Sequence, residues 1–137
     1  TSKDNFVIMT NGTKGWGGST IVVNGGTFNG SIQSKGYIAG GIYVANSDEV
    51  TVNGGTFNIT NGVGIVARSG KTTVNEGVQF NITSDGTITA GRVGDAKIDI
   101  TIPHELVLDT SASYPGGAPT IINNTSFKVY EHTTNAD

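Results

Sequence analysis

The residue types best suited to chemistry are two arginines and the carboxylates near them. Arg68 and Arg92 lie 24 residues apart, and Asp95 and Asp99 follow the second arginine. In a chain that repeats with a period close to this spacing, both arginines would lie on one face and could bind an anion. Exposed charges usually have no further role. We therefore expect a solvated pair of arginines, with an anion-binding pair as the alternative.

The histidines and the remaining acidic residues do not complete a catalytic or metal-binding motif. His104 precedes Glu105, but the second histidine of the zinc motif HExxH is missing, and His132 lies far along the chain. Glycosidases place two carboxyl groups beside the scissile bond, whereas the sole adjacent acidic pair here is Asp48 and Glu49. We expect two surface histidines, no catalytic, cofactor or metal site, and a protein that is not an enzyme.

The elements that must position these side chains are defined by an internal repeat. The string VNGGTFN at Val23–Asn29 recurs letter for letter at Val52–Asn58, and a looser version, VNEGVQFN, follows at Val74–Asn81. Recurrence of this kind is typical of repeat architectures, in which each repeat packs on the next. Asparagine and glycine in the middle of each string favour a sharp turn. We expect each string to form a strand, a corner and a second strand.

A second element recurs between these strings. Apolar runs begin at Ile42, at Ile65 and, more weakly, at Ile88, so that both intervals are 23 residues. This unit is shorter than the roughly 40–45 residues of a propeller blade, and no segment has the apolar spacing of a helix. The sequence therefore predicts an all-β fold, a single-stranded parallel β-helix (β-solenoid) of about four to five short coils over residues 1–102.

Equivalent residues of successive coils stack about 4.8 Å apart in such a fold. We expect an internal aromatic row, an internal aliphatic row and a hydrogen-bonded asparagine row at the corners. The members of these rows are Phe28, Phe57 and Phe80; Ile42, Ile65 and Ile88; and Asn24, Asn53 and Asn75. Glycines after the asparagines can adopt positive φ at the corner.

Two inserts interrupt the regular spacing early in the chain. One falls within NGTKGWGGST and carries Trp16, the sole tryptophan, and the other lies near Gly30 to Gly40 and carries Tyr37. Insertions in repeat proteins map to loops, often on a binding face. Trp16 either folds over the open end of the coils or presents a platform for a sugar or a partner. The candidate binding residues are therefore Trp16, Tyr37, Arg68 and Arg92.

From Pro103 the repeat pattern decays. ELVLDT and PTIINNTSFKVYEH still have the composition of strands, and the turn-rich SYPGGAP separates them. An open end of a stack of strands exposes unpaired edges, which natural arrays cover. We interpret residues 103–137 as C-terminal strands that cap the coils, with the start of a following module as the alternative.

Together, VNGGTFN, GIYVAN and GIVARSGKTTVNEG resemble repeats of bacterial surface proteins in the pectate-lyase-like class of right-handed parallel β-helices. The resemblance covers roughly residues 6–102. It implies right-handed coils and an extracellular or cell-surface location on a bacterium. The class includes polysaccharide lyases, glycoside hydrolases, phage tailspikes and non-catalytic adhesins, so the fold leaves the function open.

Composition narrows the possible partners. The chain has 137 residues, no cysteine and a net charge of −3, and its lysines and arginines are dispersed along the sequence. This dispersal argues against nucleic acid. No apolar run approaches the roughly 18 residues of a membrane span, and the first residues lack the pattern of a signal peptide. We expect no nucleic-acid binding and no membrane insertion, and we interpret the chain as a mature or excised fragment.

The leading functional hypothesis is a non-enzymatic extracellular module of a bacterial cell-surface protein. It would act as an adhesin-like binding domain or as a spacer, and its partner would be a cell-surface glycan or a protein. The alternative is a carbohydrate-active protein of the polysaccharide lyase or glycoside hydrolase type, or a fragment of one. A third hypothesis, ice binding, needs regular rows of threonine. Thr27 and Thr56 fit such a row, but Val78 or Gln79 interrupts it in the third repeat.

Overall fold

The structure is a computed structural model that describes residues 1–3, 5–10, 18–32, 38–93, 96–111 and 117–132. These residues form fifteen β-strands joined by turns and bends, and no helix occurs among them. Three sheets contain thirteen of the strands, and every pairing within them is parallel. The remaining two strands form a small antiparallel sheet.

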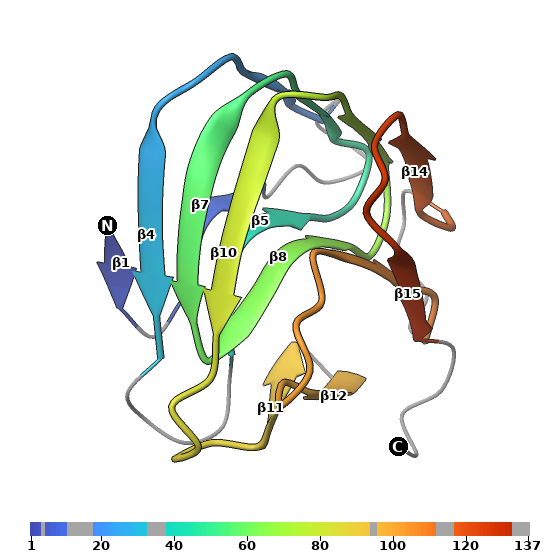
Figure 1. The fold of residues 1–137 in the computed structure, drawn as a ribbon. Coiled ribbons are helices and arrows are strands. Elements are labelled where there is room, and N and C mark those ends of the chain that lie inside the picture. The colour runs from blue at the N-terminus through green and yellow to red at the C-terminus, as the bar shows by residue number, and fades with distance from the viewer. Residues whose placement is uncertain (4, 11–17, 33–37, 94–95, 112–116, 133–137) are drawn as a thin grey trace.

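Sheet A contains β1 (Ser2–Lys3), β4 (Thr27–Ser31), β7 (Gly55–Thr60) and β10 (Val78–Thr83), in this spatial order. The last three run side by side and in the same direction (Figure 1). β4 and β7 include the ends of the two identical sequence strings. The TFN segments that the two strings share are thus paired with each other in register.

Sheet B is the widest sheet and has the spatial order β15, β13, β8, β5, β2. Its strands are β2 (Phe6–Met9), β5 (Ala39–Val44), β8 (Gly62–Ala67), β13 (Leu106–Asp109) and β15 (Val129–His132).

Sheet C consists of β3 (Thr20–Val23), β6 (Glu49–Val52), β9 (Lys71–Val74) and β14 (Thr120–Asn123). Sheet D is the antiparallel pair β11 (Ala90–Val93) and β12 (Ala96–Asp99), drawn in the lower part of Figure 1.

The chain visits the three parallel sheets in a fixed order. It passes through β3, β4 and β5, then through β6, β7 and β8, and then through β9 and β10, moving each time from sheet C to sheet A to sheet B. The prediction of an all-β chain with parallel sheets is confirmed. The predicted single β-helix of about four to five coils over residues 1–102 is not confirmed, because the antiparallel sheet D lies between β10 and β13 in the chain.

The phenylalanine row forms as the repeat predicted. Phe28, Phe57 and Phe80 are Cα partners in sheet A, with ring centroids 4.7 Å and 5.4 Å apart along the row. Phe127 follows at 5.2 Å as a fourth ring. Phe57 has no exposed surface, whereas Phe28 and Phe80 are half-buried. The expected burial is therefore complete only for Phe57, which has a ring on either side.

The asparagine row also forms and extends one residue beyond the prediction. Asn53 Nδ2 donates to Asn24 Oδ1 at 2.9 Å and Asn75 Nδ2 donates to Asn53 Oδ1 at 2.7 Å. Asn124 Nδ2 continues the row by donating to Asn75 Oδ1 at 2.8 Å. At the same corner, Gly26, Gly55 and Gly77 have φ values of 108°, 108° and 103°, a region that only glycine adopts without strain.

The expected aliphatic row is wrong at its third position. Ile42 pairs with Ile65, but the next Cα partner of Ile65 is Leu106 rather than Ile88. Ile88 lies just before β11 and contacts both apolar clusters as a half-buried residue. The 23-residue interval between Ile65 and Ile88 is therefore coincidental, and the segment between β10 and β13 is an insertion.

Sheet B buries side chains on both of its faces. In β8, Ile65 belongs to the cluster that fills the space between the three parallel sheets, while the adjacent Val66 belongs to a second cluster. The second cluster includes Ile98 from β12 and Ile100 just after it. Successive residues of a strand point to opposite faces, so sheet D covers the outer face of sheet B. This explains why every residue of β8 is buried.

The C-terminal segment adds strands to the existing sheets. β13 pairs with β8, β15 pairs with β13, and β14 pairs with β9. The division into coils at 1–102 and a cap at 103–137 stays a prediction.

Candidate binding site

Arg68 is not on the surface, contrary to the expectation of a solvated arginine pair. It is 2% exposed, and its Nε donates to Asp109 Oδ2 at 2.8 Å in a buried ion pair. Its Nη1 also donates to the Tyr43 hydroxyl at 3.2 Å. The backbone N–H and hydroxyl of Ser111 donate to the other oxygen of Asp109 at 2.9 Å and 2.6 Å. Arg68 thus has a structural role at the end of sheet B.

Arg92 lies in a different environment and does not stack on Arg68. It is an exposed residue of β11, and its Cα partner across the hairpin is Lys97. The predicted arginine pair on adjacent coils is therefore wrong, because the second arginine belongs to the inserted hairpin. Trp16, Tyr37 and Asp95 lie outside the described residues.

The two histidines differ from the expected surface pair. His132 is 1% exposed at the end of β15, where it pairs in register with Asp109. His104 is half-buried, and its ring lies against Tyr130 with centroids 4.2 Å apart and planes tilted by 30°. The surface prediction is wrong for His132, because strands far along the sequence complete its surroundings.

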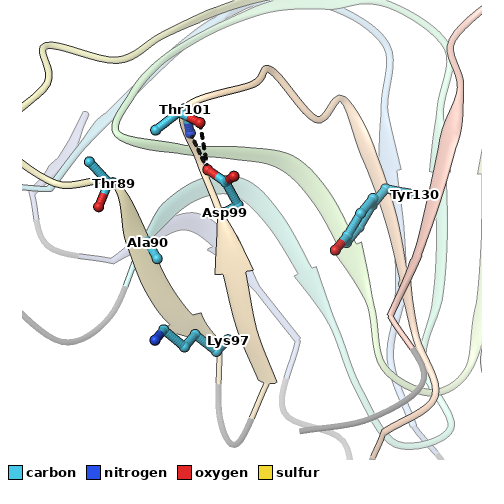
Figure 2. Close-up of a pocket in the computed structure, with 6 residues that line it drawn as sticks. All are labelled: Thr89, Ala90, Lys97, Asp99, Thr101 and Tyr130. Carbon is cyan, nitrogen blue, oxygen red and sulfur yellow. Dashed lines mark hydrogen bonds between the residues drawn. The ribbon is translucent and has the colours of Figure 1, made fainter. Parts of the chain in front are cut away.

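Asp99 and Tyr130 both line a pocket of about 330 Å³ at the hairpin, shown in Figure 2. We call it the hairpin pocket. Its lining consists of Thr89, Ala90, Lys97, Asp99, Thr101 and Tyr130. Ligand pockets generally begin at about 300 Å³, so the hairpin pocket has room for one small ligand or one unit of a larger one.

The hairpin presents its polar side chains because of simple strand alternation. Ile98 is fully buried and Ile100 is 2% exposed, whereas Lys97 and Asp99 are exposed. The apolar residues hold the hairpin on sheet B, and Lys97 and Asp99 consequently face away from that contact. Gly91 makes the close approach possible, because a Cβ there would stand 1.9 Å from Ile38 Cγ2.

Asp99 has a fixed orientation in the hairpin pocket. Thr101 donates to Asp99 Oδ1 twice, from its backbone N–H at 2.9 Å and from its hydroxyl at 2.7 Å. These hydrogen bonds, the hydroxyl bond most strongly, lower the pKa of Asp99 below its ordinary value, and the charge of His104 lowers it further. The carboxylate is therefore ionised at neutral pH and serves as a hydrogen-bond acceptor.

Tyr130 separates the hairpin pocket from a second pocket. In Figure 2 its ring extends from β15 with the hydroxyl directed toward the hairpin. The second pocket has a volume of about 570 Å³ and is lined by residues 102–105 and 126–130, so that Tyr130 contributes to both. His104 lies against the ring within this second pocket. Tyr130 therefore presents an aromatic wall at the junction of two hollows.

The combined groups are suited to binding rather than to a defined reaction. One aromatic ring, one ammonium group and one oriented carboxylate line the hairpin pocket, together with threonine hydroxyls. Among the described residues, no three His, Asp or Glu side chains gather as a metal site would require. Asp48, from the adjacent acidic pair, is buried and accepts a hydrogen bond from Ser19 N at 2.6 Å. Within the described ranges there is also no helix that could cross a bilayer.

The hairpin pocket was missed because the sequence of β11 was assigned to a regular coil. A usable signal was present, since Gly94-Asp95 separates two short β-like runs, AGRV and AKID. Glycine next to aspartate between two such runs indicates a hairpin. A hairpin there would have removed Ile88 from the aliphatic row and moved Arg92 away from Arg68.

Comparison with known proteins adds no assignment: no protein-family model, curated protein or solved structure matches this chain.

Proposed function

We propose that this chain is a non-enzymatic, right-handed β-helix module of a bacterial cell-surface protein, and that it binds a glycan in the hairpin pocket in the manner of an adhesin. The fixed passage through sheets C, A and B supports the β-helix. The resemblance of the NGG repeats to bacterial surface proteins supports the location. The hairpin interrupts the coils without ending them.

The observation that carries the binding proposal is that Tyr130, Lys97 and Asp99 line one pocket. A sugar ring has apolar C–H faces and a rim of hydroxyl groups. The apolar face packs on a flat aromatic ring, as amphipathic ligands do at tyrosine and tryptophan. The rim needs both donors and acceptors, which the ammonium of Lys97 and the carboxylate of Asp99 provide.

The charges of the hairpin pocket favour an uncharged sugar. Lys97 and Asp99 contribute one positive and one negative charge, and both are exposed. A phosphate or a multiply charged anion would meet Asp99, and a cation would meet Lys97. A neutral saccharide avoids both repulsions and hydrogen-bonds to both groups. Because the lining is open to water, we expect weak binding by one module, with an affinity gained by multivalent display.

Binding by the parent protein and three variants on an array of neutral glycans tests this proposal. Tyr130→Leu removes the flat ring but keeps apolar volume, and Asp99→Ala removes the acceptor. Asp85→Ala is the matched control, because Asp85 also accepts both hydrogen bonds of a threonine two residues later but does not line the hairpin pocket.

We expect the parent and Asp85→Ala to bind the same glycans. Both pocket variants should bind roughly ten-fold more weakly or worse, because Asp99→Ala removes a charged acceptor and Tyr130→Leu removes the flat ring. Circular dichroism must show that all four proteins are folded. Equal binding by parent and pocket variants would remove the site from the hairpin pocket. Absence of binding by the parent would favour the spacer function.

A further inference from the structure

We infer that the Asn24–Gly25 peptide is a site of spontaneous covalent modification, at which Asn24 deamidates while the other Asn-Gly pairs of the described chain are protected. The other pairs are Asn29–Gly30, Asn53–Gly54 and Asn61–Gly62. All four sites have the same Asn-Gly dipeptide, but their backbone environments differ. The inference concerns the end of the asparagine row and is independent of glycan binding.

The reaction needs only the chain and water. After water or hydroxide removes its proton, the backbone nitrogen of Gly25 forms a bond to Cγ of Asn24. The bond from Cγ to Nδ2 breaks, and the side-chain nitrogen leaves as ammonia with a proton from water. Water then opens the five-membered succinimide at either carbonyl, which yields aspartate or isoaspartate. Glycine favours the first step because it lacks a Cβ beside the attacking nitrogen.

The hydrogen bonding of the Asn24 side chain favours attack of the Gly25 nitrogen on Cγ of Asn24. Its Oδ1 accepts a hydrogen bond from Asn53 Nδ2 at 2.9 Å, which draws electrons from Cγ and makes that carbon more electrophilic. Asn24 is the end of the row that only accepts, so no neighbour in the row holds its Nδ2 in place. Asn53 differs because its own Nδ2 donates a hydrogen bond to Asn24 Oδ1.

The backbone at Gly25 is also the most open of the four. Asn24 and Gly25 are both exposed and lie between β3 and β4, outside either strand. Nothing lies within 4 Å of the position that a Cβ of Gly25 would occupy. The exposed side of Gly25 therefore leaves room for a local movement that brings its nitrogen toward Cγ.

The other three glycines are held by close neighbours. Gly54 and Gly62 are buried, whereas Gly25 is exposed, and a Cβ at Gly62 would clash with the Ala39 carbonyl oxygen. Gly30 lies inside β4 and pairs with both Ile59 and Ser2. Cyclisation at these positions requires local opening of the sheets, which lowers its rate.

Asn29 is an internal control for this inference. Like Asn24, it accepts from the next asparagine, since Asn58 Nδ2 donates to Asn29 Oδ1 at 2.9 Å. It is also exposed and followed by glycine. The two sites differ in the backbone, because Gly30 is buried within a strand and Gly25 is free of strand pairing. A difference in their rates therefore measures the effect of the sheet.

Peptide mapping by mass spectrometry, after incubation of the folded protein at mildly alkaline pH, tests the inference. We expect Asn24 to convert about ten-fold faster than the other three asparagines, because an opening that costs about 1.4 kcal/mol slows a reaction ten-fold. In denaturant the four rates should converge, because the sequence neighbours are alike. Equal rates at Asn24 and Asn29 in the folded protein would overturn the inference.

Gly25→Ala provides the second test. Gly25 does not have positive φ and has open space at the Cβ position, so alanine should be accepted without loss of folding. The added methyl group hinders the nitrogen of residue 25, and Asn24 should then convert no faster than Asn29. Unchanged conversion of Asn24 in a folded Gly25→Ala protein would also contradict the mechanism.

Discussion

The corner between sheets C and A and the hairpin on sheet B are both built from short β-strands, but their side chains make different contacts. At the corner, three repeats place asparagine above asparagine and phenylalanine above phenylalanine, and each side chain meets a copy of itself. At the hairpin, Lys97, Asp99 and Tyr130 come from segments without internal similarity. Regular stacking uses its side chains to hold the sheets together, whereas the irregular insertion leaves polar groups directed into a hollow.

The largest loss of stability should come from truncating a side chain of the phenylalanine row. Phe57→Ala removes the fully buried central ring of the phenylalanine row, and the cavity left behind should destabilise the protein by about 3–5 kcal/mol. Phe28→Ala, at the half-buried end of the row, should cost less. Urea unfolding measures both values. An equal cost for the two variants would mean that the row has no buried centre.

A comparable loss of stability is expected from breaking the buried Arg68–Asp109 ion pair at the end of sheet B. Asp109→Leu leaves the charge of the buried Arg68 without its carboxylate partner, which typically costs about 3–5 kcal/mol. Combining it with Arg68→Met replaces the whole ion pair by apolar groups and should recover much of that loss. Thermal and urea unfolding of the single and double variants provide the comparison. A double variant less stable than Asp109→Leu would contradict this account of the pair.

A smaller effect is expected from the asparagine row. Asn53→Ala removes one hydrogen bond to Asn24 and one from Asn75, each contributing about 0.5–1.5 kcal/mol at most because the row is exposed. Asn24→Ala, at the end, removes one of these bonds. Hydrogen exchange of the backbone at Asn53 and Thr56 should report local loosening. Equal exchange in parent and variant would show that the backbone alone holds the corner.

The smallest effect concerns the pKa of Asp99 in the hairpin pocket and its contribution to stability. Because hydrogen bonds from Thr101 lower the pKa of Asp99 in the folded protein, ionisation of Asp99 favours folding above its unfolded pKa. That contribution is lost as the pH falls through the lowered, folded pKa. Titration of the Asp99 carboxyl carbon by NMR should therefore give a pKa below 3.8, and Thr101→Val should raise it. An unchanged pKa in Thr101→Val would exclude the Thr101 hydroxyl as the main cause, because the variant keeps the backbone N–H that also donates to Asp99.

Repetition determined how much of the fold could be predicted. The exact recurrence of VNGGTFN identified the phenylalanine and asparagine partners, because identical strings in a parallel sheet align in register. Ile88 was misassigned because its spacing from Ile65 matched the period by coincidence. Paired strands depend on contacts between distant segments, and spacing alone does not distinguish a fourth coil from an inserted hairpin.

The site was less predictable than the fold for a related reason. Arg68 and His132 look like surface residues in the sequence, but strands far along the chain and the hairpin cover the outer face of sheet B. The sequence places Asp99 near the arginines, whereas Lys97 and Tyr130 line the hairpin pocket with it in the structure. The expectation of binding at the inserts that carry Trp16 and Tyr37 stays a prediction, because both residues lie outside the described part of the chain.

Chemical-shift mapping with a neutral oligosaccharide tests the central claim most directly. The account predicts that backbone and side-chain signals of Thr89, Lys97, Asp99 and Tyr130 shift with increasing sugar, while signals of Asn53 and Asn58 in the regular region stay in place. Shifts confined to the outer faces of sheets A and C, or no shifts with any glycan that the intact protein binds on an array, would contradict the assignment of binding to the hairpin pocket.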